Sequence, residues 1–279
     1  MSIGGRAKLA GVIGWPVAHS LSPRLHAFWL AAHGIDGAYV PLPVRREDFA
    51  RVVDALRRAG FVGVNVTVPH KEAGFALAQD LDAAARAAGA ANLLVFRGGR
   101  IEGRNTDAAG LAASLGEELG KAAVSGKDVA ILGAGGAARA AVLAMDQLGA
   151  RSIRLVARNR GRGEALLPSA NISVHDWNDP AALAGAELLV NATSAGMDGR
   201  PAPGVALDAL PVAAVVCDLV YNPLDTDFLR AARARGHRTV DGLGMLMHQA
   251  VPAFEAFFGE RPRVTPALRA ELRKALRHG

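Results

Sequence analysis

The 279-residue sequence has little cysteine, few aromatic residues and no long apolar run. Its one cysteine, Cys217, cannot form an internal disulfide, so we expect a core residue in a reducing compartment such as the cytoplasm. No run of about 18 apolar residues occurs, which excludes a membrane-spanning helix. The first residues also lack the apolar core and cleavage pattern of a signal peptide. These absences favour a cytoplasmic protein without a membrane partner.

Lysine is also scarce. The formal net charge is +6, but only 5 of the 32 lysines and arginines are lysines. The basic residues are scattered without interleaved aromatics, so no nucleic-acid partner is expected and an anionic small molecule is favoured. Lys71 stands out because a lysine can exchange a proton after a modest pKa shift, whereas a guanidinium effectively cannot.

Strand-like and helix-like segments alternate along the chain, which predicts an α/β fold with parallel pairing. In the first series we predict strands at 9–15, 37–44 and 61–68, helices at 22–34, 46–60, 71–79 and 82–89, and a hairpin at 91–103. Ser22 is expected as the N-cap of the first helix, and Gly34 as its end. The second series has predicted strands at 127–132, 152–158, 186–193, 213–221 and 237–242, with helices following most of them. The two α/β units are expected to meet near residues 104–110, and helices end the chain.

A glycine turn in the second series indicates a nucleotide site. The segment "GAGGAA" (133–138) stands between a strand and a long helix. Gly133 permits a tight turn, Gly135 allows close approach to a pyrophosphate, and Ala138 replaces the usual third glycine. A tight turn without a ligand is the alternative interpretation.

The next strand indicates which nucleotide is bound. An NAD site expects an acidic residue near its end, but this sequence has Ala157 and Arg158, with Arg160 and Arg162 close by. Because arginines grip phosphates bidentately, NADP is favoured. A solvated basic loop remains the alternative.

Polar residues of the first half suggest a substrate site. In "NVTVPHK" (65–71), Val64, Val66 and Val68 alternate with Asn65 and Thr67, the pattern of a half-buried strand, and Lys71 follows at its carboxyl end. Open α/β sheets bind ligands at that edge. Other candidates are Ser20, Ser22, Asn92, Asp107 and Gln249. Most of them also have a structural explanation, such as helix capping by Ser22 and Asp107, but capping by Ser22 does not explain Ser20.

Taken together, these segments resemble the shikimate dehydrogenase family over nearly the whole chain. The matching segments are "GVIGWPVAHSLSPRLH", "NVTVPHK", "GAANLL", "GRNTDAAG", "GAGGAAR", "VNATSAGM", "DLVYNP" and "DGLGMLMHQA", in the family's order. The resemblance implies an N-terminal α/β substrate domain (1–107) that the C-terminal helices (243–279) complete, and a Rossmann-type NADP domain (108–242). It also implies reversible NADPH-dependent reduction of 3-dehydroshikimate to shikimate, in aromatic amino acid biosynthesis.

The resemblance implies a role for each matching position. Lys71 and Asp107 would be the catalytic pair, with the lysine exchanging the proton of the C3 oxygen. Ser20, Ser22 and Tyr221 would bind the substrate carboxylate, and Asn65, Thr67, Asn92, Asp107 and Gln249 would line or bind its hydroxyl side. The cofactor contacts would be Gly133, Ala134, Gly135, Gly136, Ala137, Arg158, Arg162, Leu219 and Gly242. No metal is implied.

Several alternatives stay open. The family commonly has Asn-Arg-Thr at Ala157-Arg158-Asn159, and often methionine at Leu219. His70 is the alternative base, although neighbouring strand residues should point to opposite faces. A broader quinate/shikimate dehydrogenase and a non-catalytic NADP-binding regulator are the rival functions. Either a monomer or a homodimer fits the sequence.

Overall fold

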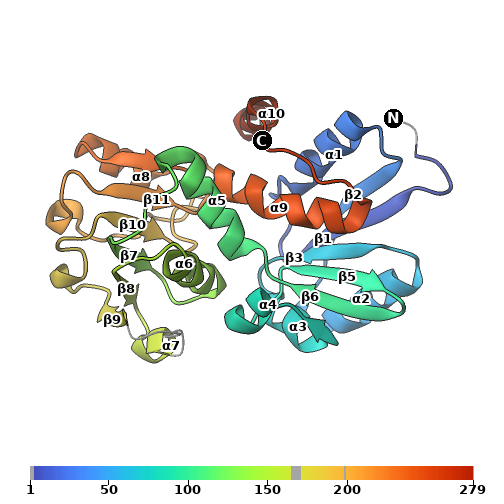
Figure 1. Cartoon of the computed structure of the whole chain (residues 1–279), viewed down its shortest axis with the longest axis horizontal. Helices are drawn as coiled ribbons and strands as arrows, with labels where there is room; N and C mark the ends of the chain where they lie inside the picture. The colour runs from blue at the N-terminus through green and yellow to red at the C-terminus, as the bar shows by residue number, and fades with distance from the viewer. Residues whose placement is uncertain (1–2, 165–170, 198, 279) are drawn as a thin grey trace. The chain divides into compact units, whose positions relative to one another are not determined.

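The computed structural model describes residues 3–164, 171–197 and 199–278. The chain divides into two compact units, which are described separately (Figure 1). Unit 1 comprises Met1–Thr106 and Gln249–Gly279, and unit 2 comprises Asp107–His248. The division therefore falls at the first residue of helix α5 (Asp107–Leu119) and inside helix α9 (Leu243–Phe258).

Unit 1 is built on a six-stranded sheet with the order β2-β1-β3-β5-β6-β4. Its strands are β1 (Lys8–Gly14), β2 (Gly37–Pro43), β3 (Gly63–Val66), β4 (Asp80–Leu81), β5 (Leu93–Arg97) and β6 (Arg100–Arg104). Its helices are α1 (Ser22–His33), α2 (Phe49–Arg58), α3 (Lys71–Leu77), α4 (Ala83–Ala88), α10 (Pro266–His278) and most of α9. β1 pairs in parallel with β2 and β3, whereas β5 is antiparallel to β3 and β6.

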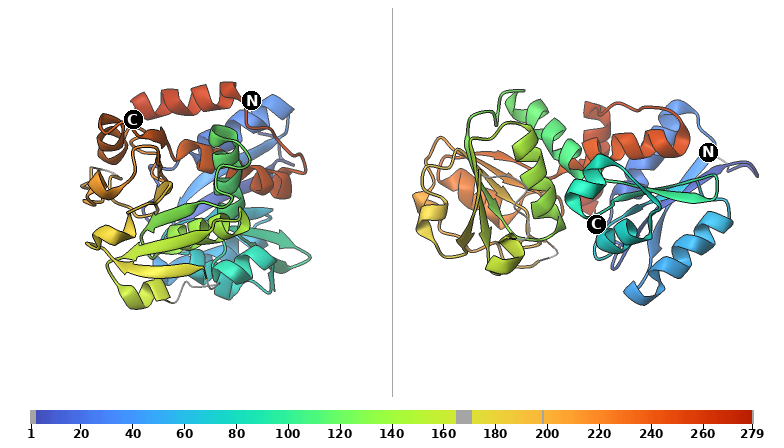
Figure 2. Two further views of the ribbon diagram at one scale, coloured as in Figure 1. Left: turned by 60° about the vertical axis from the view of Figure 1, so that its left-hand side comes forward. Right: turned by 60° about the horizontal axis from the view of Figure 1, so that its bottom comes forward.

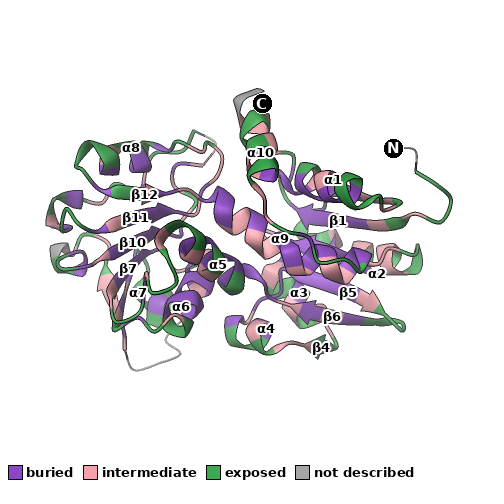
Figure 3. Ribbon diagram, turned by 45° about the horizontal axis from the view of Figure 1, so that its top comes forward, coloured by how far each residue is buried: buried purple, intermediate pink, exposed green. Residues whose placement is uncertain are grey.

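Helices cover both faces of this sheet, as Figure 1 and the burial colours of Figure 3 show. On one face, Trp29 of α1 packs edge-on against Phe254 of α9, at 5.4 Å between ring centroids. On the other face, Phe49 and Val53 of α2 pack with the valines of β3. The helix that follows β1 and the helix that precedes β3 thus lie on opposite faces, and in such sheets the carboxyl ends of the strands are the expected ligand edge.

The structure corrects the predicted strand 61–68. β3 ends at Val66, and all four of its residues are buried because helices cover both faces. Val68 lies outside the sheet and is 69% exposed, so the predicted alternation of buried valines stops after Val66. The predicted hairpin is confirmed, with β5 and β6 joined at Gly98 and Gly99.

The helix starts of unit 1 also differ from the prediction. Ser22 is the first residue of α1 and Leu21 is its N-cap, so the predicted capping role of Ser22 is wrong. The end of α1 at Gly34 is confirmed. The helix predicted at 46–60 consists of a 3₁₀ turn, η1 (Arg46–Asp48), followed by α2.

Unit 2 is a parallel six-stranded sheet with the order β12-β11-β10-β7-β8-β9, the arrangement of Rossmann folds. Its strands are β7 (Asp128–Leu132), β8 (Ser152–Ala157), β9 (Ile172–Asp176), β10 (Leu188–Asn191), β11 (Val215–Asp218) and β12 (Arg238–Val240). Its further helices are α6 (Gly136–Gln147), α7 (Arg160–Glu164), α8 (Asp227–Ala234) and the 3₁₀ turns η2 (Pro180–Ala182) and η3 (Leu207–Ala209). Figure 2 shows α5 and α6 on one side of this sheet and α8 on the other.

One strand of unit 2 was not predicted. The segment after β8 was expected to be helix-like, but its described residues include strand β9 as well as the short α7. β9 pairs with β8 so that Ala157 lies opposite Asp176. Within the described ranges, no helix has the length and apolarity needed to cross a membrane, and no cluster of three or more His, Cys, Asp or Glu could hold a metal ion.

Candidate active site

The candidate substrate residues of unit 1 begin where β1 and β3 end. Gly14 closes β1, and a Cβ on it would approach Thr67 Cγ2 to 2.5 Å, so only glycine lets Thr67 pack there. The backbone N–H of Thr67 donates to Ile13 O at 2.9 Å, which fixes the chain as it leaves β3. Thr67, a predicted site residue, is therefore held at the carboxyl edge of the sheet.

The predicted amides of unit 1 form one hydrogen-bonded network, in which Asn65 and Asn92 are buried and Gln249 is half-buried. Asn65 accepts a hydrogen bond from Tyr39 Oη at 2.8 Å and donates to Asn92 O at 3.1 Å. Asn92 donates to Thr106 Oγ1 at 2.9 Å and more weakly to Gln249 Oε1 at 3.4 Å. The network fixes the orientation of these amides.

Thr106 ties the returning helix to the sheet. Its hydroxyl donates to Gln249 O at 2.9 Å, and its backbone N–H donates to Asn92 Oδ1 at 2.9 Å. Thr106 was not predicted as a site residue, although it precedes Asp107 in the matching segment. Through it, Asn92 and Gln249 lie together although 157 positions separate them.

Lys71 begins α3 and is half-buried, and its carbonyl accepts from the backbone N–H of Ala91 at 2.9 Å. It is not a strand residue, so the expected alternation of His70 and Lys71 across a strand is wrong. His70 lies next to it, 1% exposed. Its Nε2 donates to Val44 O at 2.7 Å, and its ring stacks on Phe49 at 4.8 Å. These contacts, and not the alternation of side chains along a strand, place His70 in the core.

The two serines lie at the entrance to α1. Ser20 Oγ accepts a hydrogen bond from the backbone N–H of Ser22 at 3.3 Å. Ser22 is 7% exposed. Hydroxyls at this point lie beside the amino-terminal end of a helix, where the helix dipole favours an anionic group. The position of the two hydroxyls therefore suits a carboxylate, which the sequence pattern alone could not show.

The predicted catalytic and substrate-binding residues fall on both units. Ser20, Lys71 and the amide network belong to unit 1, whereas Asp107 and Tyr221 belong to unit 2. Asp107 is 5% exposed and is the first residue of α5 rather than a residue before it. The structure therefore brings together Asn65, Asn92 and Gln249 by direct contacts, and places the pair Lys71 and Asp107 on separate units.

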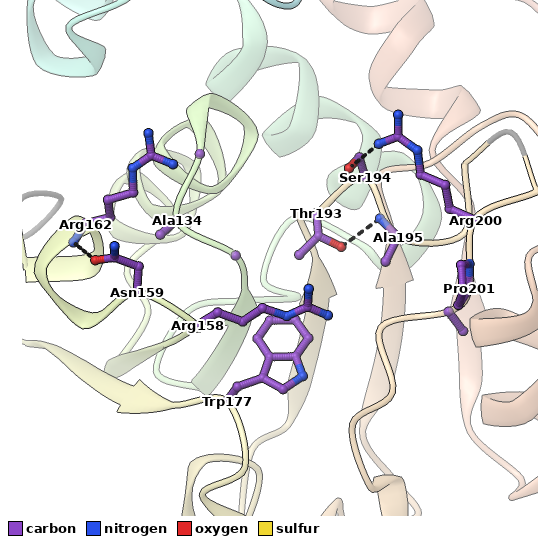
Figure 4. Close-up of a pocket in the computed structure, with 13 residues that line it drawn as sticks. Ala134, Arg158, Asn159, Arg162, Trp177, Thr193, Ser194, Ala195, Arg200 and Pro201 are labelled. Carbon is purple, nitrogen blue, oxygen red and sulfur yellow. Dashed lines mark hydrogen bonds between the residues drawn. The ribbon is translucent and has the colours of Figure 1, made fainter.

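Unit 2 has a cavity of about 550 Å³ at the carboxyl ends of β7, β8 and β10, where the sheet order reverses (Figure 4). Gly133 has φ +117°, and a Cβ there would lie 3.1 Å from Ala192 O, so the turn needs glycine. Gly135 is the N-cap of α6, with open space on its Cα side. The loop places the first backbone N–H groups of α6 beside the cavity, an arrangement that suits a pyrophosphate.

Arginines supply the charge of this cavity. Arg158, Arg162 and Arg200 line it, and no acidic residue does among the residues described. Asn159 accepts a hydrogen bond from the backbone N–H of Arg162 at 3.1 Å, which shapes the loop that carries both predicted arginines. An NAD site would carry an acid at this edge. The cavity therefore suits NADP and disfavours the unphosphorylated ribose.

The segment after β10 forms the opposite wall. Asn191 Oδ1 accepts from the backbone N–H and the hydroxyl of Thr193, and Thr193 Oγ1 accepts from Ala195 N–H at 3.1 Å. Ser194 accepts from Arg200 Nη1 at 2.9 Å. This segment carries part of the family resemblance, but the sequence alone did not point to its individual residues. The cavity residues Trp177, Thr193, Ser194 and Arg200 were not predicted.

A buried carboxylate, Asp218, lies next to the end of β10 and hydrogen-bonds to Asn191. Asp218 ends β11 with 0% exposure and accepts hydrogen bonds from Asn191, Thr226 and the backbone N–H of Val220. Burial raises the pKa of Asp218 to about 6, against the lowering effect of these hydrogen bonds. Asp218 thus fixes the chain that leaves β11, which carries Leu219 and Tyr221.

Gly242 packs against that chain. A Cβ on it would lie 2.4 Å from Leu219 O and 2.8 Å from Val220 O, so no other residue fits without movement. Leu219 N–H donates to Asn191 O at 3.0 Å. The predicted cofactor residues Leu219 and Gly242 are therefore neighbours in unit 2, although neither lines the described cavity.

Comparison with known proteins extends these observations. The family model described as "Shikimate dehydrogenase substrate binding domain" matches residues 12–94. Shikimate dehydrogenase (NADP(+)) from Paramagnetospirillum magneticum is 52% identical over 95% of this chain and 98% of its own length.

Two solved structures are similar in fold and sequence. Shikimate 5-dehydrogenase from Thermus thermophilus in complex with NADP(H) and shikimate has a TM-score of 0.85 and 35% identity, over 97% of this chain and 99% of its own. Quinate dehydrogenase from Corynebacterium glutamicum in complex with NAD has a TM-score of 0.87 and 30% identity, over 96% and 99%. The identity and coverage of these relatives show that the chain belongs to the shikimate dehydrogenase family.

Proposed function

We propose that this chain catalyses the reversible NADPH-dependent reduction of 3-dehydroshikimate to shikimate, in the shikimate pathway of aromatic amino acid biosynthesis. The observation that carries the proposal is the cavity of unit 2, with three arginines and no acidic lining residue among those described, in a chain of this family. The substrate-binding domain would be 1–107 completed by 243–279, and the cofactor domain 108–242. The single cysteine, buried in β11, fits a cytoplasmic enzyme.

The cofactor would be held by unit 2. The loop residues Gly133, Ala134, Gly135, Gly136 and Ala137 would take the pyrophosphate through backbone N–H groups at the start of α6. Arg158 and Arg162 would take the 2′-phosphate, because planar guanidiniums bind phosphates bidentately. Leu219 and Gly242 would lie beside the nicotinamide. When bound, NADPH supplies the hydride for carbonyl reduction.

The substrate would be held mainly by unit 1. Ser20 and Ser22 would donate to its carboxylate, with Tyr221 of unit 2 assisting. Its hydroxyls would meet Thr67 and the amides Asn65, Asn92 and Gln249, whose orientations the Tyr39–Asn65–Asn92–Thr106 network fixes. A polyhydroxylated ring needs such preset donors and acceptors, because flexible amides would lose entropy on binding.

Lys71 and Asp107 would carry out the proton chemistry. Reduction of the C3 carbonyl leaves negative charge on its oxygen, and the Lys71 ammonium would donate the proton that completes the hydroxyl. In the reverse direction the lysine amine would accept that proton. Asp107 would accept a hydrogen bond from the substrate hydroxyl and so orient it. His70 is unsuitable, because it is buried against Phe49 with its Nε2 donating to Val44.

The test is an assay with the purified chain. Shikimate and NADP should give reduced cofactor, seen by its absorbance, and 3-dehydroshikimate with NADPH should give the reverse signal. Quinate should be a poor substrate, and NAD a poor cofactor. Equal turnover of quinate with NAD would favour the broader quinate/shikimate enzyme. Cofactor binding without turnover of either substrate would favour the non-catalytic regulator.

A further inference from the structure

Trp177 lies in the cofactor cavity directly beneath one of its arginines. The guanidinium carbon of Arg158 lies 4.8 Å from the centre of the Trp177 ring (Figure 4). Both residues follow the ends of neighbouring strands, because Ala157 of β8 is in register with Asp176 of β9. The contact is therefore built into the pairing of the sheet.

The two sides of the indole have different environments. Trp177 is half-buried and packs against the core cluster that includes Ala182 and Leu183. Arg158 is exposed and covers the side that faces the cavity. The ring is thus a fixed platform for a side chain that would otherwise sample many rotamers.

Stacking leaves the hydrogen-bonding edge of Arg158 unused. A guanidinium meets an aromatic ring with its flat face, while its N–H donors lie in its plane. Those donors can still bind a phosphate bidentately. Stacking and phosphate binding are therefore compatible on one arginine.

A neighbouring arginine shows the contrast. Arg160 pairs with Glu164 at 3.1 Å and with Asp176 at 4.0 Å. Among the residues described, Arg158 has no carboxylate within salt-bridge distance, although Asp176 directly precedes Trp177. The indole, rather than a carboxylate, holds Arg158, so its charge is not neutralised before a ligand arrives.

From this geometry we infer that Trp177 is a positioning residue for the 2′-phosphate of the cofactor, acting through Arg158 and contributing to the choice of NADP over NAD. The inference rests on the proposed function, since the phosphate belongs to NADP. Trp177 does not itself contact the phosphate. Its contribution is to hold the guanidinium in one place, so that less rotamer freedom is lost on binding.

The experiment measures binding rather than turnover. Isothermal titration compares adenosine 2′,5′-bisphosphate with adenosine 5′-monophosphate, which differ only by the 2′-phosphate. In Trp177→Leu the dissociation constant of the bisphosphate should rise roughly fivefold, the worth of an exposed cation–π contact, while that of the monophosphate stays the same. Trp177→Phe keeps an aromatic face and should fall between wild type and Trp177→Leu.

Two further variants isolate the pair. In an Arg158→Ala background, Trp177→Leu should cause no additional loss of bisphosphate affinity, because the residue through which it acts is gone. Trp15→Leu removes a second arginine–tryptophan stack, Arg45 over Trp15 in unit 1, and should leave the ratio of the two affinities unchanged. Trp177→Phe also serves if Trp177→Leu does not fold.

The outcomes separate the inference from the proposed function. An equal loss of affinity for both nucleotides in Trp177→Leu would show that Trp177 stacks the adenine or only supports the fold, and would overturn the inference. An unchanged bisphosphate affinity would also overturn it. If wild type itself binds both nucleotides equally, NADP preference is wrong, and the proposed function fails instead.

Discussion

The two units present their candidate sites in opposite ways. In unit 1 the amides Asn65 and Asn92 are buried, and hydrogen bonds link them to Tyr39 and to the half-buried Gln249. In unit 2 the cavity is open, and Arg158 and Arg162 stand exposed without an acidic partner among the described residues. Unit 1 has organised its polar groups before a ligand arrives, and unit 2 has kept its charge unneutralised. The first arrangement suits the shape of a small ring, and the second suits a phosphate.

The largest expected effect comes from the one candidate acid–base group in unit 1. Lys71→Ala should lower kcat by roughly 10²-fold or more, because a positioned proton donor contributes that much. NADP affinity should be nearly unchanged, since the proposed cofactor residues lie in unit 2. Steady-state kinetics and titration of NADP measure the two effects. A joint loss of kcat and NADP affinity would contradict the assignment of proton transfer to unit 1 and of cofactor binding to unit 2.

The second prediction tests the buried carboxylate behind the cofactor cavity. Burial raises the pKa of Asp218 to about 6, above its unfolded value of 3.8. The protonated carboxyl therefore contributes its full stabilisation of the fold below pH 3.8, and this stabilisation is lost as the pH rises through 6. Asp218→Asn should remove this dependence, which is on the order of 2 kcal/mol between pH 4 and 7. Urea unfolding at both pH values measures it. Parallel pH profiles of wild type and variant would contradict a raised pKa.

A third prediction reverses the charge of the cofactor cavity. Arg158→Asp should weaken NADP binding by at least roughly tenfold, since it replaces a charge-assisted hydrogen bond with repulsion of the phosphate. NAD binding should change far less, and the KM for shikimate should stay the same. Dissociation constants for both cofactors provide the measurement. Arg160→Asp is the matched control, because Arg160 already pairs with acidic residues.

The smallest effect is expected at the entrance to α1. Ser20→Ala and Ser22→Ala should each raise the KM for shikimate several-fold. Each removes one hydrogen-bond donor to the substrate, which contributes about 1 kcal/mol to binding. Only Ser20→Ala should also lower the melting temperature, because Ser20, and not Ser22, accepts a backbone N–H at this helix start. Thermal unfolding of both variants is the check. Unchanged kinetics in both would leave the serines a purely structural role.

Local patterns were the part of this protein that the sequence predicted well. The turn at Gly133 and the hairpin at Gly98 and Gly99 depend on backbone rules that act over a few residues. The arginines after β8 were visible because an acid is expected at that position in an NAD site. All of these depend on short spacings along the chain.

Features that depend on long-range packing were missed or misread. Val68 was expected to be buried, but β3 ends two residues earlier and the chain leaves the sheet. β9 carries few apolar residues and was not predicted. Without that strand, the sequence could not show that Trp177 lies next to Arg158. Thr106 gains its role only where α9 returns to unit 1, and no local pattern shows that contact.

The most direct measurement of the account is the Lys71→Arg variant, with kcat for shikimate oxidation and NADP affinity determined on the same preparation. The substitution keeps the positive charge but removes a group that can exchange a proton. The account predicts a kcat almost as low as that of Lys71→Ala, roughly 10²-fold below wild type, with NADP affinity intact. A near-normal kcat would show that Lys71 supplies charge rather than a proton, and would contradict the central claim.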